Sequence, residues 1–498
     1  MAHPQSLGSV SPIVHSRTDS FLFPRAAHRT SEDMSTSVPL DPELAAIGEA
    51  RSQAQSARRA FDAFHGVTQE HADNIVRAMA KAAEDSAKEL ARLAVEETGY
   101  GVYEDKILKN LFNAKFCAHA MLQMRTLGVL WVDEPNRVTA IGAPMGVIAA
   151  IIPVTNPTST TIFKCLAAVK SGNAIVCAPH PRAARCCART VEIMAAAAEE
   201  AGAPKGLLQC LSGGQLPATR ELMAHRDVAL VMATGGAAMV RAAYSSGKPT
   251  LAVGAGNVPV YIHRSVADVS EAALMVVVSK SFDNGTACVA EQSVVLDEPI
   301  ADAALRAFEQ HGTVFLSPDD QRRLVDLLFA GRGTLNPDAV GQTAVELARR
   351  IGLAVPSGTK VLGAVLNDVG PQTPLSAEIL GPVLSFYRAR DLDAAHARCR
   401  EVLAFGGEGH TLGLHGRDET MIARMSDLPA SRIIVNSPSL LGGMGFSAGT
   451  DPSFMLGTGT WSGSIVSDNV TPMHLINIKR IAHENRPWRD IYSPTMGL

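Results

Sequence analysis

A turn-rich segment that ends in a cysteine is the first place where this sequence can do chemistry. It runs from Ser281 through Phe-Asp-Asn-Gly-Thr-Ala to Cys288 and follows a predicted helix over 269–279. Nucleophiles are often held on loops of a rigid scaffold, and the backbone N–H groups of a turn can stabilise an oxyanion. We therefore expect Cys288 to be the reactive thiol and the other seven cysteines to be small buried hydrophobes, at positions 117, 165, 177, 186, 187, 210 and 399.

A second candidate lies at Pro153-Val-Thr-Asn156-Pro-Thr158, between an apolar run and a helical pattern. In open parallel sheets, ligands bind at the carboxyl ends of the strands. The amide of Asn156 can donate to an oxyanion there. It can equally form an Asx turn or cap the following helix, and the local sequence leaves both interpretations open.

Two glycine-rich turns carry further candidates. Thr234-Gly235-Gly236 follows a predicted strand and opens a helix, where glycines let a phosphate approach the helix N-terminus, although such turns are common. His410 follows three glycines in a short segment, and these neighbours predict an accessible loop histidine. Histidine is suited to proton transfer near neutral pH, with a purely structural role as the alternative.

Strand and helix patterns alternate through the middle of the chain. Short apolar runs separated by helices of 10–20 residues predict βαβ units, a parallel sheet and a doubly wound α/β fold of the nucleotide-binding type. A second α/β set begins near residue 260, and alternation over 127–141 predicts a hairpin. The expected strands are 146–154, 174–178, 206–211, 228–233, 293–296, 313–316 and 361–366; the expected helices are 158–171, 182–201, 216–224, 269–279, 302–310 and 319–328.

Composition excludes several classes of partner. The 498 residues carry 45 basic and 49 acidic side chains, so the net charge of −4 gives no reason to bind nucleic acid or an anionic membrane. The uncharged stretch 138–163 is interrupted by prolines and fits a strand–turn–helix better than a membrane span. The cysteines lack zinc-ligand spacing, so no metal site is expected. These features predict a cytoplasmic protein with free thiols.

The order of these motifs resembles the aldehyde dehydrogenase superfamily. The match comprises Asn156, Thr234-Gly235-Gly236, Cys288 and Glu378-Ile-Leu-Gly-Pro-Val383, and it covers nearly all of residues 40–480. Within the superfamily, the sequence is similar to the CoA-acylating branch, which contains bifunctional alcohol/aldehyde dehydrogenases, propionaldehyde dehydrogenase and acylating sulfoacetaldehyde dehydrogenase. The segments that carry this closer resemblance are 233–249, 254–259, 281–285, 432–438 and 475–479.

The resemblance implies a role for each motif. Cys288 becomes the nucleophile, and Asn156 with the Cys288 backbone N–H becomes the oxyanion hole. Thr234, Gly235 and Gly236 approach the dinucleotide pyrophosphate, with Pro153 beside the cofactor. Glu378 holds the nicotinamide ribose, and His410 serves the thiol chemistry.

The resemblance also implies a domain layout and a homodimer or tetramer. Residues 34–126 and 143–260 form the dinucleotide-binding domain, and 261–436 form the catalytic domain. Oligomerisation elements are expected at 127–142 and 464–498, with a Gly-rich return to the cofactor domain at 437–463. Residues 1–33 are expected to be a disordered tail or a mis-assigned start, with Met34 as a natural start.

One departure from the superfamily bears on the reaction. Hydrolytic members carry Leu-Glu-Leu-Gly-Gly, whose glutamate activates water, whereas this chain has Leu251-Ala-Val-Gly-Ala255. Alanine cannot act as a base, so we expect the thioester on Cys288 to be transferred to coenzyme A. The alternatives are a hydrolytic enzyme in which another carboxylate, such as Glu291, activates water, and a non-catalytic filament or scaffold homologue.

The sequence leaves open which nicotinamide cofactor and which aldehyde the protein uses. The turn after strand 174–178 contains His180 and Arg182 and no acid, so NADP is allowed as well as NAD. The resemblance implies acetaldehyde, propionaldehyde or the anionic sulfoacetaldehyde as substrate, and an upstream enzyme that produces the aldehyde.

Overall fold

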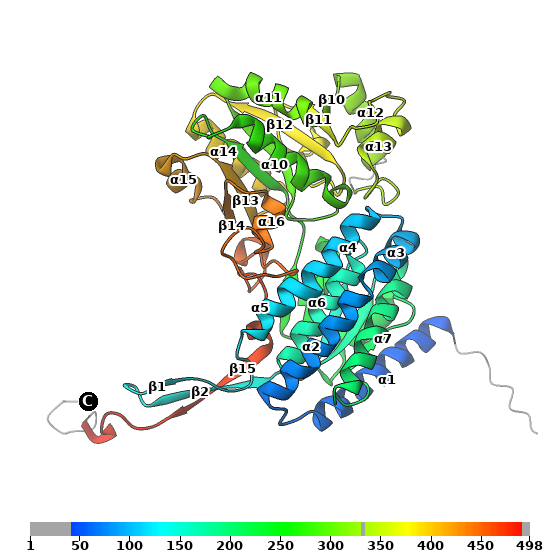
Figure 1. Ribbon diagram of the computed structural model, residues 1–498, viewed down its shortest axis with the longest axis vertical. Coiled ribbons are helices and arrows are strands. Elements are labelled where there is room, and N and C mark those ends of the chain that lie inside the picture. The colour runs from blue at the N-terminus through cyan, green and yellow to red at the C-terminus, as the bar shows by residue number, and fades with distance from the viewer. Residues whose placement is uncertain (1–40, 330–333, 491–498) are drawn as a thin grey trace, which may run out of the picture. The chain divides into compact units, whose positions relative to one another are not determined.

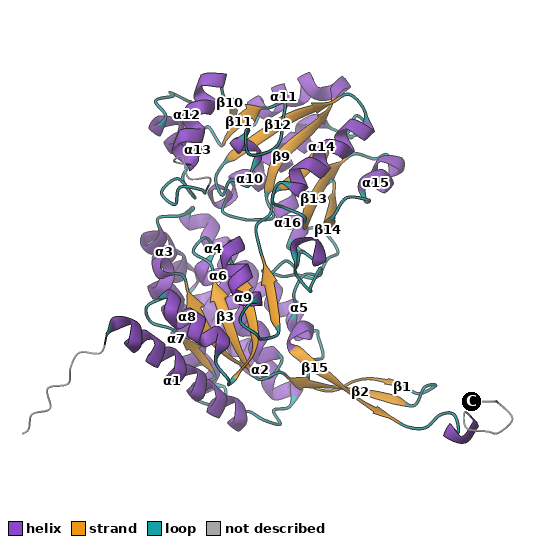
Figure 2. Cartoon of the chain, turned by 180° about the vertical axis from the view of Figure 1, so that it is seen from behind, coloured by secondary structure: helices purple, strands orange, loops and turns teal. Residues whose placement is uncertain are grey.

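A computed structural model describes residues 41–329 and 334–490 of the chain (Figures 1 and 2). The described residues from Pro42 onward belong to one large unit. The expectations for residues 1–33, and the last part of the expected element at 464–498, lie outside the described residues. Within the described part, no helix combines the length and the apolar character needed to cross a bilayer.

The first sheet is parallel and has five strands in the order β5-β4-β3-β6-β7. The doubly wound order is confirmed. From β3 the chain adds β4 and β5 on one side and then returns to add β6 and β7 on the other, so the strand order reverses between β3 and β6. Every residue of β3 and β4 is buried, as expected for strands covered on both faces. The strands are β3 (Val147–Ile152), β4 (Ala174–Pro179), β5 (Leu208–Cys210), β6 (Val228–Thr234) and β7 (Thr250–Val253), of which β7 was not predicted.

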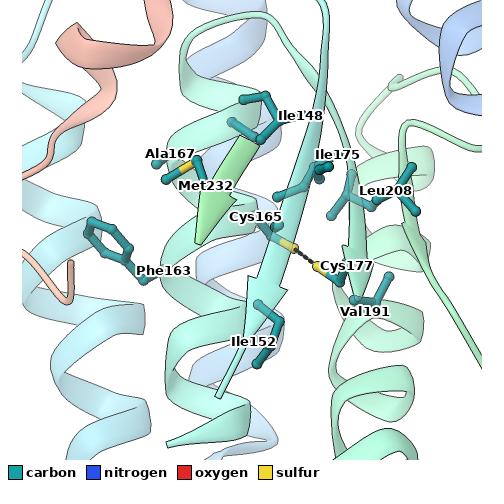
Figure 3. Close-up of a cluster of buried hydrophobic side chains, with 14 of the residues drawn as sticks. Ile148, Ile152, Phe163, Cys165, Ala167, Ile175, Cys177, Val191, Leu208 and Met232 are labelled. Carbon is teal, nitrogen blue, oxygen red and sulfur yellow. Dashed lines mark hydrogen bonds between the residues drawn. The ribbon is translucent and has the colours of Figure 1, made fainter. Parts of the chain in front are cut away.

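Two groups of helices pack on this sheet, α1 with α8, and α2 with α6 and α7. Figure 3 shows part of the core that results, in which Ile148, Phe163 and Met232 are fully buried. Cys165 and Cys177 are also fully buried there, with their sulfur atoms 3.9 Å apart, so they serve as small hydrophobes. The helices of this part are α1 (Pro42–Ala63), α2 (Gln69–Asp85), α3 (Ala87–Thr98), α4 (Tyr103–Leu111), a π-helical turn (Phe112–Cys117), α5 (Ala118–Leu122), α6 (Pro157–Lys170), α7 (Ala184–Glu200), α8 (Leu216–Ala224) and α9 (Ala237–Tyr244).

The second sheet is also parallel and has the order β10-β11-β12-β9-β8-β13-β14. The strands expected at 293–296, 313–316 and 361–366 are confirmed, but four others were missed. Strand β13 shows why, because it buries two histidines and two glycines that give no apolar pattern. The strands are β8 (Val258–Ile262), β9 (Glu291–Asp297), β10 (Thr313–Phe315), β11 (Val361–Val365), β12 (Val383–Ala389), β13 (Gly409–His415) and β14 (Ala430–Val435); the helices are α10 (Val269–Ser281), α11 (Ala301–Gln310), α12 (Pro318–Phe329), α13 (Ala344–Arg350), α14 (Leu392–Ala404), α15 (Glu419–Met425) and α16 (Ser439–Gly443).

The predicted hairpin is confirmed as β1 (Gly128–Asp133) and β2 (Val138–Pro144), which pair antiparallel. Strand β15 (Ile476–Ala482) adds to β2 and makes a third strand of this sheet. Between the Gly-rich segment and β15, Val466, Val470 and Leu475 pack in the core of the first sheet. The chain therefore stays with that core as far as Leu475. Among the described residues that follow, β15 pairs with β2, and residues 483–485 hydrogen-bond to the hairpin turn at Asn136 and Arg137.

Candidate active site

A cavity of about 530 Å³ collects most of the predicted site residues. On one side it is lined by the segments that follow β3, β4, β6 and β7, at the carboxyl ends of the first sheet. On the other side it is lined by the loops that precede β9 and β12 of the second sheet and by the Gly-rich segment. The predicted residues that line it are Pro153, Asn156, His180, Thr234, Gly235, Gly236, Cys288 and Glu378.

The second sheet presents the opposite end of its strands. Cys288 lies three residues before β9, Glu378 lies five before β12, and His410 is the second residue of β13. Because β12, β9, β8 and β13 are neighbours in a parallel sheet, their amino ends meet at one edge. The rule that ligands bind at carboxyl ends locates Asn156 and Thr234, but it does not locate this half of the site.

The Cys288 side chain is part-exposed and faces the cavity. Burial of the thiol, followed by the charge of Glu378, raises the pKa of Cys288 to about 12, while Arg432 and Lys109 act in the opposite direction. The group is therefore a neutral thiol at pH 7. Because only the thiolate is nucleophilic, the reaction must include removal of this proton.

Asn156 lies at the first position before α6, but its side chain makes no capping hydrogen bond. Its Oδ1 accepts a hydrogen bond of 2.7 Å from Lys109 Nζ, and its Nδ2 donates one of 2.9 Å to the carbonyl of Thr286, two residues before Cys288. The amide is thus directed at the cysteine loop. Of the two interpretations that the sequence allowed, the side-chain cap is the wrong one.

The prediction that His410 is an accessible loop residue is wrong, because His410 is fully buried within β13. The reason is that Gly407 and Gly409 press against backbone, at Asn257 and Thr458, rather than opening the loop to solvent. His410 Nδ1 lies 3.0 Å from Thr411 Oγ1, and Nε2 has no hydrogen-bond partner.

Two observations connect His410 with the cysteine. A side chain at Gly256 would begin 3.0 Å from the His410 ring and 2.2 Å from the Cys288 carbonyl oxygen, so the glycine separates the two by its backbone alone. Burial, with the charge of Arg432, lowers the pKa of His410 well below its usual value. The imidazole is therefore neutral, and His410 does not itself line the cavity.

Glu378 is the one carboxylate among the described residues that line the cavity. Its Oε1 accepts a hydrogen bond of 3.0 Å from the Gly256 N–H. Burial raises the pKa of Glu378 to about 7, against the effects of this hydrogen bond and of Lys280. The alternative carboxylate, Glu291, is fully buried in β9, accepts from the Ser439 N–H at 2.8 Å and does not line the cavity.

The opening of α9 has the features that a dinucleotide pyrophosphate needs. Thr234 Oγ1 is buried without a hydrogen-bond partner, and a Cβ at Gly236 would meet no atom within 4 Å. A free hydroxyl and open space at a helix N-terminus suit a phosphate group. The residues present therefore fit the cofactor that the sequence implies.

The turn after β4 brings only one of its two predicted residues to the cavity. His180 lines it, but Arg182 does not. The Arg182 guanidinium donates to the Thr98 carbonyl at 3.0 Å and to Tyr100 Oη at 3.3 Å, and it lies over the Tyr100 ring. A contact between Arg182 and a 2′-phosphate would require these bonds to break.

Sequence reasoning missed a buried ion cluster behind the cysteine loop. Lys106 and Lys109 of α4 donate to the same oxygen of Asp283, at 2.8 and 2.5 Å. Asp283 and Asn284 both have a left-handed backbone, with φ of 50° and 52°. Burial lowers the pKa of Lys109 to about 8, with Asp283 opposing that shift. The only sequence signal was the spacing of two lysines on one face of a short helix.

Comparison with known proteins identifies the family. The Aldehyde dehydrogenase family pattern matches residues 35–328. The chain belongs to this family. Over 453 residues it is 39% identical to the bifunctional aldehyde-alcohol dehydrogenase AdhE of Escherichia coli K12, a match that covers 89% of this chain and 51% of that protein. The chain thus spans about half the length of the curated relatives that it matches first.

Two further similarities cover nearly the whole of the matched protein. The acylating sulfoacetaldehyde dehydrogenase of Cupriavidus necator is 36% identical over 453 residues, with 90% of this chain and 91% of the relative covered. The crystal structure of an acetylating aldehyde dehydrogenase from Geobacillus thermoglucosidasius has a TM-score of 0.88 and 44% identity, and the match covers 90% and 99% of the two chains. The expected resemblance to the acylating branch of aldehyde dehydrogenases is confirmed.

Glu378 of this aldehyde dehydrogenase gives a stability prediction with a definite sign. Because the pKa of Glu378 is raised to about 7 in the folded state from a usual 4.5, the folded state loses stability as the pH rises from 4.5 to 7, and this loss is complete above pH 7. We expect Glu378→Gln to increase the unfolding free energy at pH 8 by at most about 3 kcal/mol, and so to raise the melting temperature. At pH 5 it should have little effect. Thermal unfolding measured across this range tests it, with the exposed Glu96→Gln as control. An equal effect of Glu378→Gln at both pH values would contradict the assignment.

Proposed function

We propose that this chain is a CoA-acylating aldehyde dehydrogenase, which converts a short-chain aldehyde, CoA and NAD(P)⁺ to acyl-CoA and NAD(P)H. The observation that supports it most is one arrangement: Cys288 and Asn156 share a cavity, and a neutral buried His410 lies against the Cys288 loop. Ala252, where hydrolytic relatives carry a glutamate, is buried in β7.

In the first half-reaction the Cys288 thiol passes its proton to solvent in the cavity, and its sulfur then attacks the aldehyde carbonyl carbon. The oxygen becomes an oxyanion, which the Asn156 amide and the Cys288 backbone N–H stabilise; one such donor typically contributes about 10²–10³ in rate. Thr234, Gly235, Gly236 and Glu378 would hold the nicotinamide cofactor, which when bound accepts the hydride. A thioester on Cys288 remains.

In the second half-reaction the thioester needs an acceptor. A thiol with an unperturbed pKa of about 8.5, the value for cysteine, is mostly protonated at pH 7. His410, whose Nε2 has no hydrogen-bond partner, is the base proposed to accept this proton, and it returns the proton in the reverse direction. In the hydrolytic alternative, water would attack the thioester and Glu378 would have to activate it, because Glu378 is the one carboxylate among the described residues that line the cavity.

The cavity favours an uncharged aldehyde. Among the described residues that line it there is no lysine or arginine. The apolar cluster next to Cys288 contains Val289, Met444, Phe454 and Leu456. An anionic tail placed there would lose its hydration without a counter-charge, which costs several kcal/mol. We therefore infer acetaldehyde or propionaldehyde rather than sulfoacetaldehyde, supplied by another aldehyde-producing enzyme in the cytoplasm.

The reaction itself is tested by NAD(P)H formation from acetaldehyde, propionaldehyde and sulfoacetaldehyde, with each cofactor and with or without CoA. We expect many turnovers only with CoA, and faster turnover with the uncharged aldehydes. Cys288→Ser should abolish turnover, because a serine hydroxyl is a far weaker nucleophile. The matched control, Cys210→Ser, lies outside the cavity and should keep full activity. Steady turnover without CoA would refute the acylating reaction.

The base is tested by separating the two half-reactions. His410→Ala should slow CoA transfer about 10²–10⁴-fold while the first-turnover burst of NAD(P)H stays within a few-fold of the parent. His415→Ala is a matched control, since His415 lies in the same strand, is equally buried and also has a free Nε2. Equal loss of burst and transfer in His410→Ala would overturn this role.

The hairpin sheet supports a homo-oligomer, dimer or tetramer. It exposes large apolar side chains, with Trp131 45%, Val132 52% and Ile481 49% exposed. Apolar side chains grouped on one sheet are typical of a surface that another chain covers. We infer that β1, β2 and β15 form the contact between copies.

This contact predicts a change in molar mass. Trp131→Asp with Val132→Asp should lower the mass measured by light scattering to that of a smaller assembly, because two buried charges have no partner in the contact. Leu44→Asp, at a 57% exposed position of α1, is the control and should leave the mass unchanged. An unchanged mass in the double variant would exclude the hairpin as the contact.

A further inference from the structure

One buried ammonium group joins the two halves of the oxyanion hole. The Lys109 side chain is only 3% exposed, and its Nζ lies 2.7 Å from Asn156 Oδ1, 2.5 Å from Asp283 Oδ2 and 3.2 Å from Thr286 Oγ1. An ammonium has three N–H donors and no acceptor, so these three oxygens use its full capacity. One belongs to the oxyanion donor, and the other two belong to the loop that carries Cys288.

The charge of Lys109 decides which way the Asn156 amide faces. Oxygen and nitrogen of an amide have similar shapes but opposite hydrogen-bonding roles. Since Lys109 only donates, the amide oxygen must face it, and the nitrogen must then face the Thr286 carbonyl, 2.9 Å away. The second Nδ2 hydrogen has only the Thr155 hydroxyl, at 3.3 Å, and is the one available to an oxyanion.

We propose that Lys109 is a positioning residue for aldehyde attack: it holds the Asn156 amide nitrogen toward the cavity and keeps it in register with the Cys288 loop. The inference rests on the proposed function only in taking Asn156 as an oxyanion donor. It applies to the first half-reaction and not to the choice between CoA and water as acceptor.

Lys106 separates this role from simple support of the loop. It lies three residues earlier on α4, is equally buried and donates to the same Asp283 oxygen at 2.8 Å. Its other bond goes to the backbone carbonyl of Thr155 at 2.9 Å, and it makes no contact with the Asn156 side chain. A loss of charge at Lys106 therefore disturbs the loop without releasing the amide.

The test compares the NAD(P)H burst with acetaldehyde in Lys109→Met, Lys106→Met, Asn156→Ala and the two double variants. We expect Lys109→Met to slow the burst about 10- to 100-fold, with KM for aldehyde changed less than about 3-fold, because a misplaced group costs rate rather than binding. Alkylation of Cys288 by iodoacetamide forms no oxyanion, so it reports only the small effect of the Lys109 charge on the pKa of the thiol and should slow much less than the burst. Lys106→Met should slow the burst less than Lys109→Met.

The double variants decide whether Lys109 acts through Asn156. In the Asn156→Ala background, Lys109→Met should cause no further loss, whereas Lys106→Met should add its usual loss. Lys109→Gln keeps an N–H donor, so it must slow the burst less than Lys109→Met and, like it, cause no further loss in the Asn156→Ala background. If Lys109→Met does not fold, Lys109→Gln alone provides the test. The proposal would be overturned if the losses of burst rate in Lys109→Met and Asn156→Ala multiplied in the double variant, or if Lys109→Met and Lys106→Met slowed the burst equally. Absence of CoA-dependent turnover in the parent would refute the proposed function instead, because the burst requires no CoA.

Discussion

The buried carboxylate of Asp283 is the constraint on which the site depends. A carboxylate taken out of water costs several kcal/mol unless it is paired and hydrogen-bonded. Lys106 and Lys109 supply the charge, and the Val102 N–H and the Thr286 hydroxyl supply further hydrogen bonds. Since these partners come from α4 and from the loop itself, the cysteine loop is held to the first part of the chain in one arrangement.

The two parallel sheets contribute opposite strand ends to one cavity. The first sheet offers helix N-termini and glycine turns, which suit phosphate groups. The second sheet offers the starts of its strands, where Cys288, Glu378 and His410 precede or begin β9, β12 and β13. The first sheet therefore supplies Asn156 as well as the glycine turn, and the second supplies Glu378 as well as Cys288 and His410. Gly256, just before β8, has no side chain that would separate Cys288 from His410.

Burial keeps the reacting groups neutral before reaction. It raises the pKa values of Cys288 and Glu378 and lowers that of His410, so each favours its uncharged form. In such surroundings a charge that develops on a substrate interacts more strongly with fixed donors than it would in water. In the proposed mechanism, the Asn156 amide is a donor of this kind.

The sequence by itself determined the alternation of strands and helices and the hairpin, and it singled out Cys288, Asn156 and the Thr234 turn as candidate site residues, because each depends on local pattern or on motif order. It did not predict β13, a buried strand that contains His410 and lacks an apolar pattern. Nor did it predict that Arg182 turns toward Tyr100. The pairing of Asp283 with two lysines about 175 residues away was also invisible. Such contacts are decided by tertiary structure, because the cost of burying a charge or a polar ring depends on which partners the fold brings beside it.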